Sequence, residues 1–349
     1  MLRHSGRDST LQKDGKKVRS IEVAELAQIS RSTVSRALAG DARISEATRD
    51  RVLAAARQLG YRPNLIARGL KNQSTGIVGV VVTDLENAYH AHALQLLVEK
   101  LGAGRLAPLV FACNTVEGAE NAIARLMSYQ VDAVVALAAP FSDEIVKSCV
   151  AGEKPLVLMN RHDGDENVGV VAGDGLAAGA MVADHLVARG ARRFAFLGGE
   201  DNSFISKERE RGFTDRLVSH GFDLAVSLSS RYSYAEARVV AADILRAAPD
   251  AVFCANDTLA FALLDAARAA DAPEGERPMV VGYDNSALAG WPSYDLTSVD
   301  QNLEAMTSRT VEAAFAMIAA PDAVAERQTI APFLVERGST SSRNSSRTR

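Results

Sequence analysis

The stretch ISRSTVSRALAG, residues 29–40, predicts a short helix with two very different sides. At 100° per residue, Val34, Ala37 and Leu38 fall on one side of that helix. Ser30 precedes the helix and is a favourable N-cap, because its hydroxyl can accept a backbone N–H one turn on. The opposite side consists of Arg31, Ser32, Ser35 and Arg36.

The flanking sequence supplies two further helices for the apolar side to pack against. IEVAELA (21–27) predicts a first helix with Val23, Ala24 and Ala27 inward, and QIS forms the turn. EATRDRVLAAARQLG (46–60) predicts a third helix that begins after Ser45 and ends at Gly60. Its expected core residues are Val52, Leu53, Ala56 and Leu59. Three short helices of this kind form a helix-turn-helix head whose second helix is exposed.

The polar side of the second helix suits DNA. Short side chains let a helix lie deep in the major groove, where arginine binds guanine with two hydrogen bonds. Serine and threonine bind bases or phosphates. The alternative is an ordinary three-helix bundle with a solvated polar surface.

The charge distribution favours the DNA interpretation. The 349 residues carry a net charge of −4. Residues 1–73 nevertheless contain 15 Lys and Arg against 7 Asp and Glu, whereas the remainder contains 24 against 36. A basic head on an acidic body indicates a head that meets a polyanion.

Several classes of protein are disfavoured. Cys113, Cys149 and Cys254 are scattered and lack metal-ligand spacing, so we expect no disulfide, no metal and a reducing cytoplasm. The polar N-terminus does not resemble a secretory signal, and no apolar run is long enough for a membrane span. HAH (90–92) is a weak metal signal. No cofactor and no membrane partner are expected.

From residue 76 onward, apolar runs alternate with amphipathic helices, which predicts parallel sheets. Eight such runs favour an α/β body of two doubly wound lobes with a cleft between them. The runs are GIVGVVV, PLVFAC, VDAVVALA, PLVLMN, VGVVAG, RRFAFLGG, DAVFCAN and PMVVGYDN. Residues 1–17 and 338–349 are polar and are expected to be disordered.

The motifs S-x-x-TVSRAL, R-x-SEATRDRVLAAARQLGYRPN and A-R-G-L resemble the lac-repressor (LacI/GalR) family of bacterial transcription regulators. CANDTLAFALL, VVGYDN and WPSYDLTSVDQ match as well, so the resemblance runs from about residue 18 to 337. Two features depart from the family pattern. Gln28 replaces a turn glycine, and Arg19 and Glu22 replace a T-x-x-D capping box, so Ser20 is the alternative cap.

The resemblance implies a periplasmic-binding-protein-like body behind the three-helix head. It divides the chain into a head (18–63), a hinge helix and linker (64–75) and a body (76–337). The expected N-lobe comprises 76–173 and 302–328, and the C-lobe 174–301 and 329–337. The implied protein is a cytoplasmic, nucleoid-associated repressor that acts as a homodimer on operator DNA and is not an enzyme. No C-terminal leucine heptad follows residue 337, which favours a dimer over a tetramer.

Carried over by position, the resemblance assigns ten DNA-binding residues. Arg31, Ser32 and Arg36 are expected to read base edges, and Ser30, Thr33 and Ser35 to hold phosphates. In the hinge, Leu70 matches a leucine that wedges into the minor groove, Ala67 lies where the two hinge helices approach, and Lys71 can reach phosphate or groove. Asn64 completes the set.

Ligands of doubly wound sheets bind at the carboxyl ends of the strands. That rule and the resemblance together predict a pocket formed by Tyr89, His90, Asp174, Arg209, Tyr232, Asn256, Asp284 and Gln301. Carboxylate, amide and guanidinium groups bind hydroxyl oxygens, and an aromatic face covers a sugar or purine. We expect a sugar or sugar acid as effector, with a purine co-repressor as the alternative. Asp174 and Asp257 have a simpler interpretation as helix caps, and Asn256 as a turn residue.

Competing functions are a two-lobed small-molecule-binding protein and an enzyme. The former would lack residues 18–72, and a kinase or dehydrogenase would need a phosphate loop. GDGLAAG (173–179) has one residue too many for the dinucleotide fingerprint.

Overall fold

A computed structural model describes residues 18–38, 41–61, 74–139, 142–161, 165–200, 203–270, 277–321 and 323–341. Contacts divide the chain into two units, residues 1–73 and 74–349, which we call the head and the body. None of the helices within the described ranges has the length and apolar character that a bilayer crossing requires.

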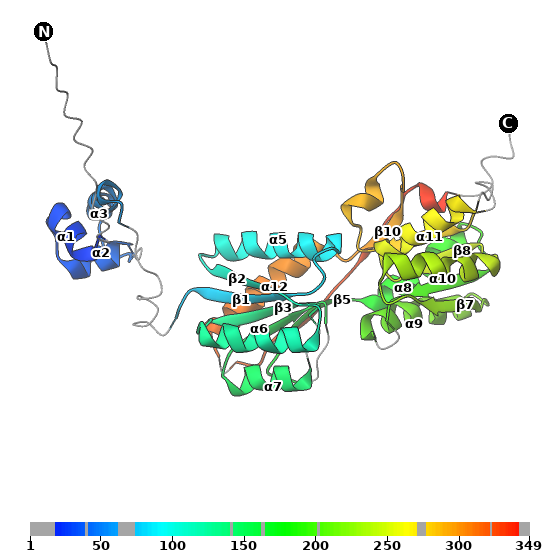
Figure 1. Ribbon diagram of the computed structural model, residues 1–349, viewed down its shortest axis with the longest axis horizontal. Helices are drawn as coiled ribbons and strands as arrows, with labels where there is room; N and C mark the ends of the chain where they lie inside the picture. Colours follow the sequence, from blue (N-terminus) through cyan, green and yellow to red (C-terminus); the bar gives the residue numbers. More distant parts are fainter. Residues whose placement is uncertain are drawn as a thin grey trace, which may run out of the picture. The chain divides into compact units, whose positions relative to one another are not determined.

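The head contains the three predicted helices, α1 (Ser20–Ala27), α2 (Arg31–Leu38) and α3 (Glu46–Leu59) (Figure 1). Val23, Val34 and Val52, one from each helix, are 0% exposed and form the centre of its core. The ends of α3 agree with the prediction. The Ser45 hydroxyl accepts a hydrogen bond from the Thr48 N–H, and Gly60 ends the helix with a left-handed φ of 64°.

One predicted core residue of the head is wrong. Leu53 is 37% exposed, and Ala55 occupies the inner side of α3 with Val52 and Ala56. The reason is helical geometry, because Leu53 lies 100° from Val52 whereas residues three and four positions on return to the same side.

The body contains two six-stranded sheets, one in each lobe. The N-lobe sheet has the order β11-β5-β4-β3-β1-β2, and all its pairings are parallel. Its strands are β1 (Ile77–Val82), β2 (Ala107–Ala112), β3 (Ala133–Leu137), β4 (Leu156–Met159), β5 (Gly169–Gly173) and β11 (Arg327–Ile330).

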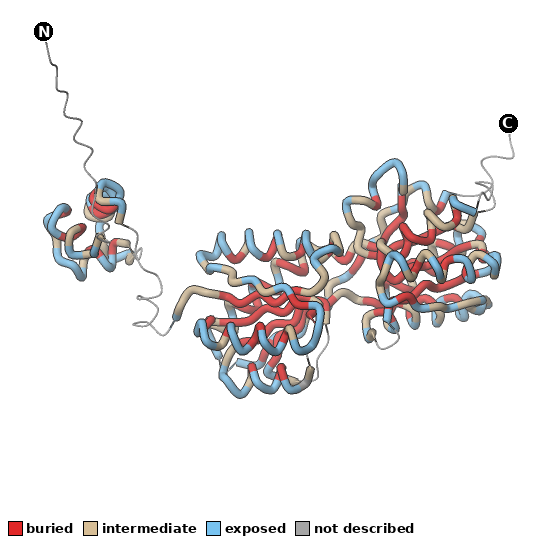
Figure 2. The backbone as a smooth tube through the Cα atoms, viewed as in Figure 1, coloured by how far each residue is buried: buried red, intermediate tan, exposed pale blue. Residues whose placement is uncertain are grey.

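Helices cover both faces of the N-lobe sheet. Helices α5 (Ala88–Ala103) and α12 (Leu303–Ala319) pack on one face, and α6 (Val116–Ser128) and α7 (Asp143–Ala151) on the other (Figure 1). Successive strand residues point to opposite faces, so the central strands β1, β3 and β4 are apolar throughout and buried between helical layers (Figure 2).

The C-lobe sheet has the order β12-β10-β9-β8-β6-β7, with only the β10–β12 pairing antiparallel among those described. Its strands are β6 (Phe194–Gly198), β7 (Leu224–Ser229), β8 (Ala251–Cys254), β9 (Met279–Tyr283), β10 (Thr297–Asp300) and β12 (Phe333–Val335). Its helices are α8 (Gly175–Ala188), α9 (Phe204–Ser219), α10 (Tyr234–Arg246) and α11 (Asp257–Ala269), with short 3-10 turns η2 (Ala287–Gly290) and η3 (Gly338–Thr340).

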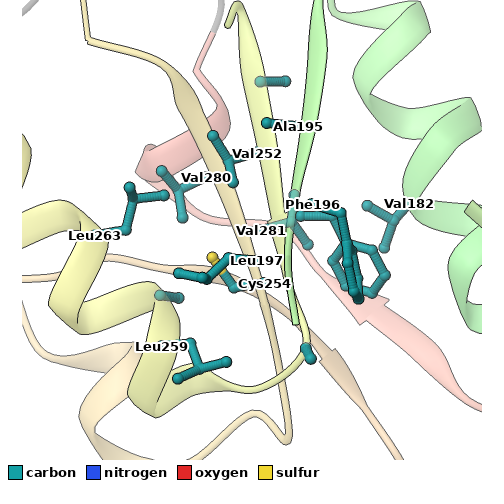
Figure 3. Close-up of a cluster of buried hydrophobic side chains, with 14 of the residues drawn as sticks. Val182, Ala195, Phe196, Leu197, Val252, Cys254, Leu259, Leu263, Val280 and Val281 are labelled. Carbon is teal, nitrogen blue, oxygen red and sulfur yellow. The ribbon is translucent and has the colours of Figure 1, made fainter. Parts of the chain in front are cut away.

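The C-lobe core lies on both sides of its sheet. Figure 3 shows Val182 of α8 beside Phe196, and Leu259 and Leu263 of α11 on the side of Leu197. Phe196 and Leu197 are neighbours on β6, so this alternation follows from the pleat of the strand.

All eight predicted apolar runs form strands, and the α/β fold with a helix-turn-helix head is confirmed. Four further strands, β7, β10, β11 and β12, were missed. β7 is an edge strand of alternating half-buried and exposed residues, and β11 reads RQTI. Strands buried on only one side, or very short, lack the continuous apolar run that identified the others.

Three predicted boundaries differ from the structure. Thr75, expected in the linker, donates its N–H to Asp132 Oδ1 at 2.7 Å and so belongs to the body. The expected lobe boundary at 328/329 lies inside β11, which continues to Ile330. The expected disordered tail from 338 is also wrong at its start, because Thr340 is 0% exposed in η3. Local composition did not reveal these long-range hydrogen bonds.

Candidate DNA-binding face and ligand pocket

The exposed side of α2 has the composition that the sequence predicted. Arg31, Ser32, Ser35 and Arg36 are exposed, whereas Val34 and Ala37 are buried in the head. Thr33 is half-buried beside them. The apolar side of the helix is therefore fully used in folding, and the polar side is left for another molecule.

A network of hydroxyl groups organises the first turn of α2. Ser30 Oγ accepts the Thr33 N–H at 3.1 Å, as expected of an N-cap. The same oxygen lies 2.8 Å from Ser32 Oγ and 2.8 Å from Thr33 Oγ1. Three of the six predicted contact residues of this helix thus hold one another in place before any partner arrives.

The start of α1 differs from the expectation. Arg19 is its N-cap residue and makes no side-chain cap bond, and Ser20 is already the first helical residue. Instead, the Ser20 hydroxyl accepts a hydrogen bond from Arg31 Nε at 3.2 Å. A serine in the helix proper points its hydroxyl away from its own N-terminal N–H groups, which explains why it does not cap.

Gln28 lies where the family pattern has glycine, and it adopts the left-handed conformation with φ 54° and ψ 47°. Its N–H bonds back to α1 and ends that helix. The hinge residues Asn64, Ala67, Leu70 and Lys71 lie outside the described residues.

In the body, Arg209 of α9 is the centre of a buried polar cluster. Its side chain is 3% exposed, and its guanidinium carbon lies 3.5 Å from the centroid of the Tyr283 ring. Nη1 donates to the carbonyl of Ala255, whereas Nε is buried without a hydrogen-bond partner in the described part of the chain.

Gln301 and Asp284 form the second half of this cluster. Gln301 is 0% exposed and donates from Nε2 to Asp284 Oδ1 at 2.7 Å. Within the ranges that the structure describes, Gln301 Oε1 is buried and has no hydrogen-bond partner. It lies close to Gly173, where an added Cβ would be 3.3 Å away. Burial without a partner is costly, so Arg209 Nε and Gln301 Oε1 are expected to bind a water molecule or a ligand.

The ionisation of the cluster reflects its burial. Burial raises the pKa of Asp284 to about 8, although the positive charge of Arg209 opposes the shift. Burial, reinforced by Asp284, also raises the pKa of Tyr89 well above its ordinary value. Tyr89 comes from the N-lobe helix α5, so the charge of Asp284 in the C-lobe acts on a side chain of the N-lobe.

Asp257, next to Asn256, is a structural member of the site. Its carboxylate accepts hydrogen bonds from Ser286 N–H at 2.7 Å and from Ser298 Oγ at 2.6 Å, which ties the loop after β9 to α11. Burial raises its pKa to about 6. It holds the Asp284 loop in place.

Two predicted pocket residues cap helices. Asp174 Oδ1 accepts the Ala177 N–H at 2.8 Å at the start of α8. Asn256 Oδ1 accepts the Leu259 N–H at 3.0 Å at the start of α11. The helix-cap interpretation is therefore confirmed for Asp174. It is wrong for Asp257, because Asn256 is the N-cap of α11 and Asp257 is already the first helical residue. Asp174 Oδ2 and Asn256 Nδ2 are not needed for these caps.

Tyr232 and His90 complete the predicted set. Tyr232 has a left-handed φ of 57°, and its ring lies on Gly199, where an added Cβ would come 2.1 Å from the ring. His90 Nδ1 lies 3.2 Å from the Asp84 carbonyl oxygen, and burial lowers the pKa of its ring.

A cavity of about 230 Å³ lies between the loop before α5 and the Asp284 loop. Of the eight predicted ligand residues, Asp284 lines it, together with Glu86, Asn87 and Asp257. Tyr283 is a residue that sequence reasoning missed. Its position as the last residue of β9, directly before Asp284, was the available signal. The described residues contain no cluster of three or more His, Cys, Asp or Glu placed to hold a metal.

Comparison with known proteins identifies the two parts of the chain. The model of bacterial regulatory proteins of the lacI family matches residues 21–64, and that of the periplasmic binding protein-like domain matches residues 183–340. The chain therefore joins a LacI-family DNA-binding domain to a periplasmic binding protein-like domain, which is the organisation of a LacI-family transcriptional regulator.

Individual relatives agree with the LacI assignment. Catabolite control protein A of Staphylococcus xylosus is 29% identical over 285 residues, covering 81% of this chain and 87% of that protein. The CelR transcriptional regulator in complex with cellobiose is 25% identical with a TM-score of 0.70, covering 92% and 99% of the two chains. The lac repressor dimer bound to operator, 22% identical with a TM-score of 0.81 and covering 93% and 99%, shows the same fold.

Proposed function

We propose that this LacI-family regulator represses transcription as a homodimer on a pseudo-palindromic operator, and that a sugar or sugar acid between the two lobes controls its affinity for DNA. It acts in the cytoplasm by binding, without catalysis. Two-fold symmetry of the protein requires a matching symmetry of the operator. The ligand favours one lobe arrangement, which changes the spacing of the two heads.

The observation that carries the ligand proposal is the pair of unpartnered buried atoms, Arg209 Nε and Gln301 Oε1. One is a donor and the other an acceptor, and vicinal hydroxyl groups provide both functions. Asp284 adds a carboxyl group, and Tyr232 adds an aromatic ring for an apolar sugar face. The relative CelR is in complex with cellobiose, which supports a sugar.

The DNA part of the proposal assigns base edges to Arg31, Ser32 and Arg36, and phosphates to Ser30, Thr33 and Ser35. Their exposure on α2 supports it. Asn64, Ala67, Leu70 and Lys71 are proposed to enter or border the minor groove as a hinge. Apolar wedging there bends the duplex.

A thermal-shift screen of sugars, sugar acids and purines tests the ligand class, because a ligand that binds only the folded protein raises its apparent stability. We expect a sugar or sugar acid to raise the melting temperature of the wild type but not of Asp284→Ala. If only purines stabilise the protein, the ligand is a purine co-repressor and not a sugar.

A gel shift against the DNA upstream of the protein's own gene, at two salt concentrations, tests the DNA part. Specific, salt-sensitive binding is expected. Arg36→Ala is expected to lose discrimination between this duplex and random DNA while the body remains folded. An unchanged preference in Arg36→Ala would show that Arg36 does not recognise bases. Turnover of a metabolite by the wild type, without specific DNA binding, would favour an enzyme.

A further inference from the structure

The Ser20 hydroxyl is not used by its own helix. Ser20 is the first residue of α1, and the N-cap position before it belongs to Arg19, which makes no cap bond. Ser20 Oγ instead accepts a hydrogen bond from Arg31 Nε at 3.2 Å. This bond joins the first residues of α1 and α2, eleven positions apart in the chain.

The bond determines which part of the Arg31 side chain is available. A guanidinium group has five N–H donors in a planar fork, one on Nε and four on the two Nη atoms. With Nε engaged by Ser20, the remaining donors are the two terminal Nη groups. Arg31 is exposed, so these groups are accessible to a binding partner.

Arg31 is the only long side chain among residues 30–33, because its neighbours at the start of α2 are short hydroxyl residues that contact one another. Ser32 Oγ lies 2.8 Å from Ser30 Oγ, so the short side chain of Ser32 is turned back toward the cap. Thr33 Oγ1 makes a similar contact at 2.8 Å. An arginine that is ordered before binding loses less rotamer freedom when it meets DNA, and lost freedom weakens binding.

We propose that Ser20 is a positioning residue that sets the specificity of Arg31. Held through Nε, Arg31 presents its two Nη groups end-on, and these donate to O6 and N7 of a single guanine in the major groove. The inference rests on the proposed function, since it requires α2 to lie in that groove. It adds a residue of α1 to the determinants of base recognition.

The test uses the full-length protein and a pool of duplexes with two randomised half-sites. Selection by the wild type gives the preferred sequence, and selection by Arg31→Ala shows which base pair depends on Arg31. We expect a guanine there, and a loss of about 5- to 150-fold in guanine preference with Arg31→Ala. Ser20→Ala is expected to reduce the same preference about two- to tenfold.

Two controls separate positioning from a structural effect. Ser20→Thr keeps the hydroxyl and is expected to restore the guanine preference at this base pair. Replacing the guanine with 7-deazaguanine, which lacks the N7 acceptor, is expected to weaken binding of the wild type more than of Ser20→Ala. Affinity for random duplexes is expected to be equal in the wild type and Ser20→Ala.

The possible failures are distinguishable. If the wild type selects no sequence, the proposed function fails. If it selects a site with an Arg31-dependent guanine, and Ser20→Ala leaves that preference unchanged or increases it, the positioning role is overturned. A uniform loss of affinity for all duplexes with Ser20→Ala would also overturn it, since only the stability of the head would then be involved.

Discussion

At the residue scale, Gln28 shows how a strained backbone position is retained in a small domain. Its φ of 54° lies in the left-handed region, which costs a residue with a Cβ about 1 kcal/mol relative to glycine. The side chain is exposed and contributes nothing to the core of the head. Gln28, in place of the family glycine, therefore lowers the stability of the head and gains no packing contact in its core.

Gln28→Gly is expected to stabilise the head by about 1 kcal/mol, because it removes this strain. Hydrogen exchange of the amides in α1 to α3 measures the effect, with about fivefold greater protection predicted. Gln28→Ala retains the Cβ and serves as the control, with no change expected. Equal protection in all three proteins would show that no strain is stored at this position.

Asp284 makes the stability of the body depend on pH. Its pKa is about 8 in the folded protein because of burial, against an ordinary value of 3.8. Between these values the folded body retains a proton that the unfolded chain releases, so the Asp284 contribution to stability declines as pH rises from about 4 to about 8. Above pH 8 the carboxylate is charged in both states.

Asp284→Asn is expected to flatten the fall in melting temperature between pH 5 and pH 8, because the amide has no proton to release in that range. Asp215→Asn, at a carboxylate whose side chain is 69% exposed, is the matched control and should follow the wild type. A curve for Asp284→Asn parallel to that of the wild type would show that Asp284 is ionised normally.

At the scale of elements, the contact between α8 and α9 positions Arg209. A Cβ at Gly179 of α8 would lie 2.3 Å from the carbonyl oxygen of Arg209, and one at Gly212 of α9 would lie 2.2 Å from that of Leu176. The two helices approach backbone to backbone because glycine has no side chain. The close contact of Gly179 with the backbone of Arg209 therefore fixes the position of Arg209.

Gly179→Ala is expected to force α9 outward, destabilise the body by about 1–3 kcal/mol and weaken ligand binding. Chemical denaturation and ligand titration measure the two effects. Gly102→Ala is the control, because a Cβ at this position of α5 meets nothing within 4 Å. It should leave ligand binding unchanged and stabilise the body by up to about 1 kcal/mol, since alanine favours a helix over glycine. Full ligand affinity in Gly179→Ala would show that the helix contact does not position Arg209.

The last described turn, η3, is a second element with a structural role. Thr340 Oγ1 lies 2.8 Å from Thr297 Oγ1, and Ser339 Oγ accepts the Thr297 N–H at 2.8 Å. Ending the chain after Arg337 removes these partners and should destabilise the body by at least about 2 kcal/mol, since Thr297 is 0% exposed. Ending it after Ser341 should preserve them. Equal denaturation midpoints would contradict this role.

Across the whole molecule, the sequence predicted what depends on local pattern. The eight apolar runs and the two-sided helix α2 were visible because burial imposes a period on the residues. Strand β11 and the turn η3 were not visible in the sequence, because their polar residues are hydrogen-bonded to segments far away in the chain, β5 and Thr297 respectively. The ligand pocket could be predicted from the sequence only in part. Asp284 was predicted from the end of a strand and Gln301 from the family resemblance, but their direct hydrogen bond, and the stacking of Arg209 on Tyr283, required the fold.

Ligand bound in the body is proposed to control DNA binding by the head. The decisive measurement is the affinity of the full-length protein for its selected duplex, with and without the stabilising sugar or sugar acid. We predict a change of about 5- to 150-fold on addition of ligand, the usual range for coupling between two sites. Asp284→Ala should bind the duplex like the wild type but show no change. A ligand that binds the body and leaves the wild-type affinity for DNA unaltered would contradict the account.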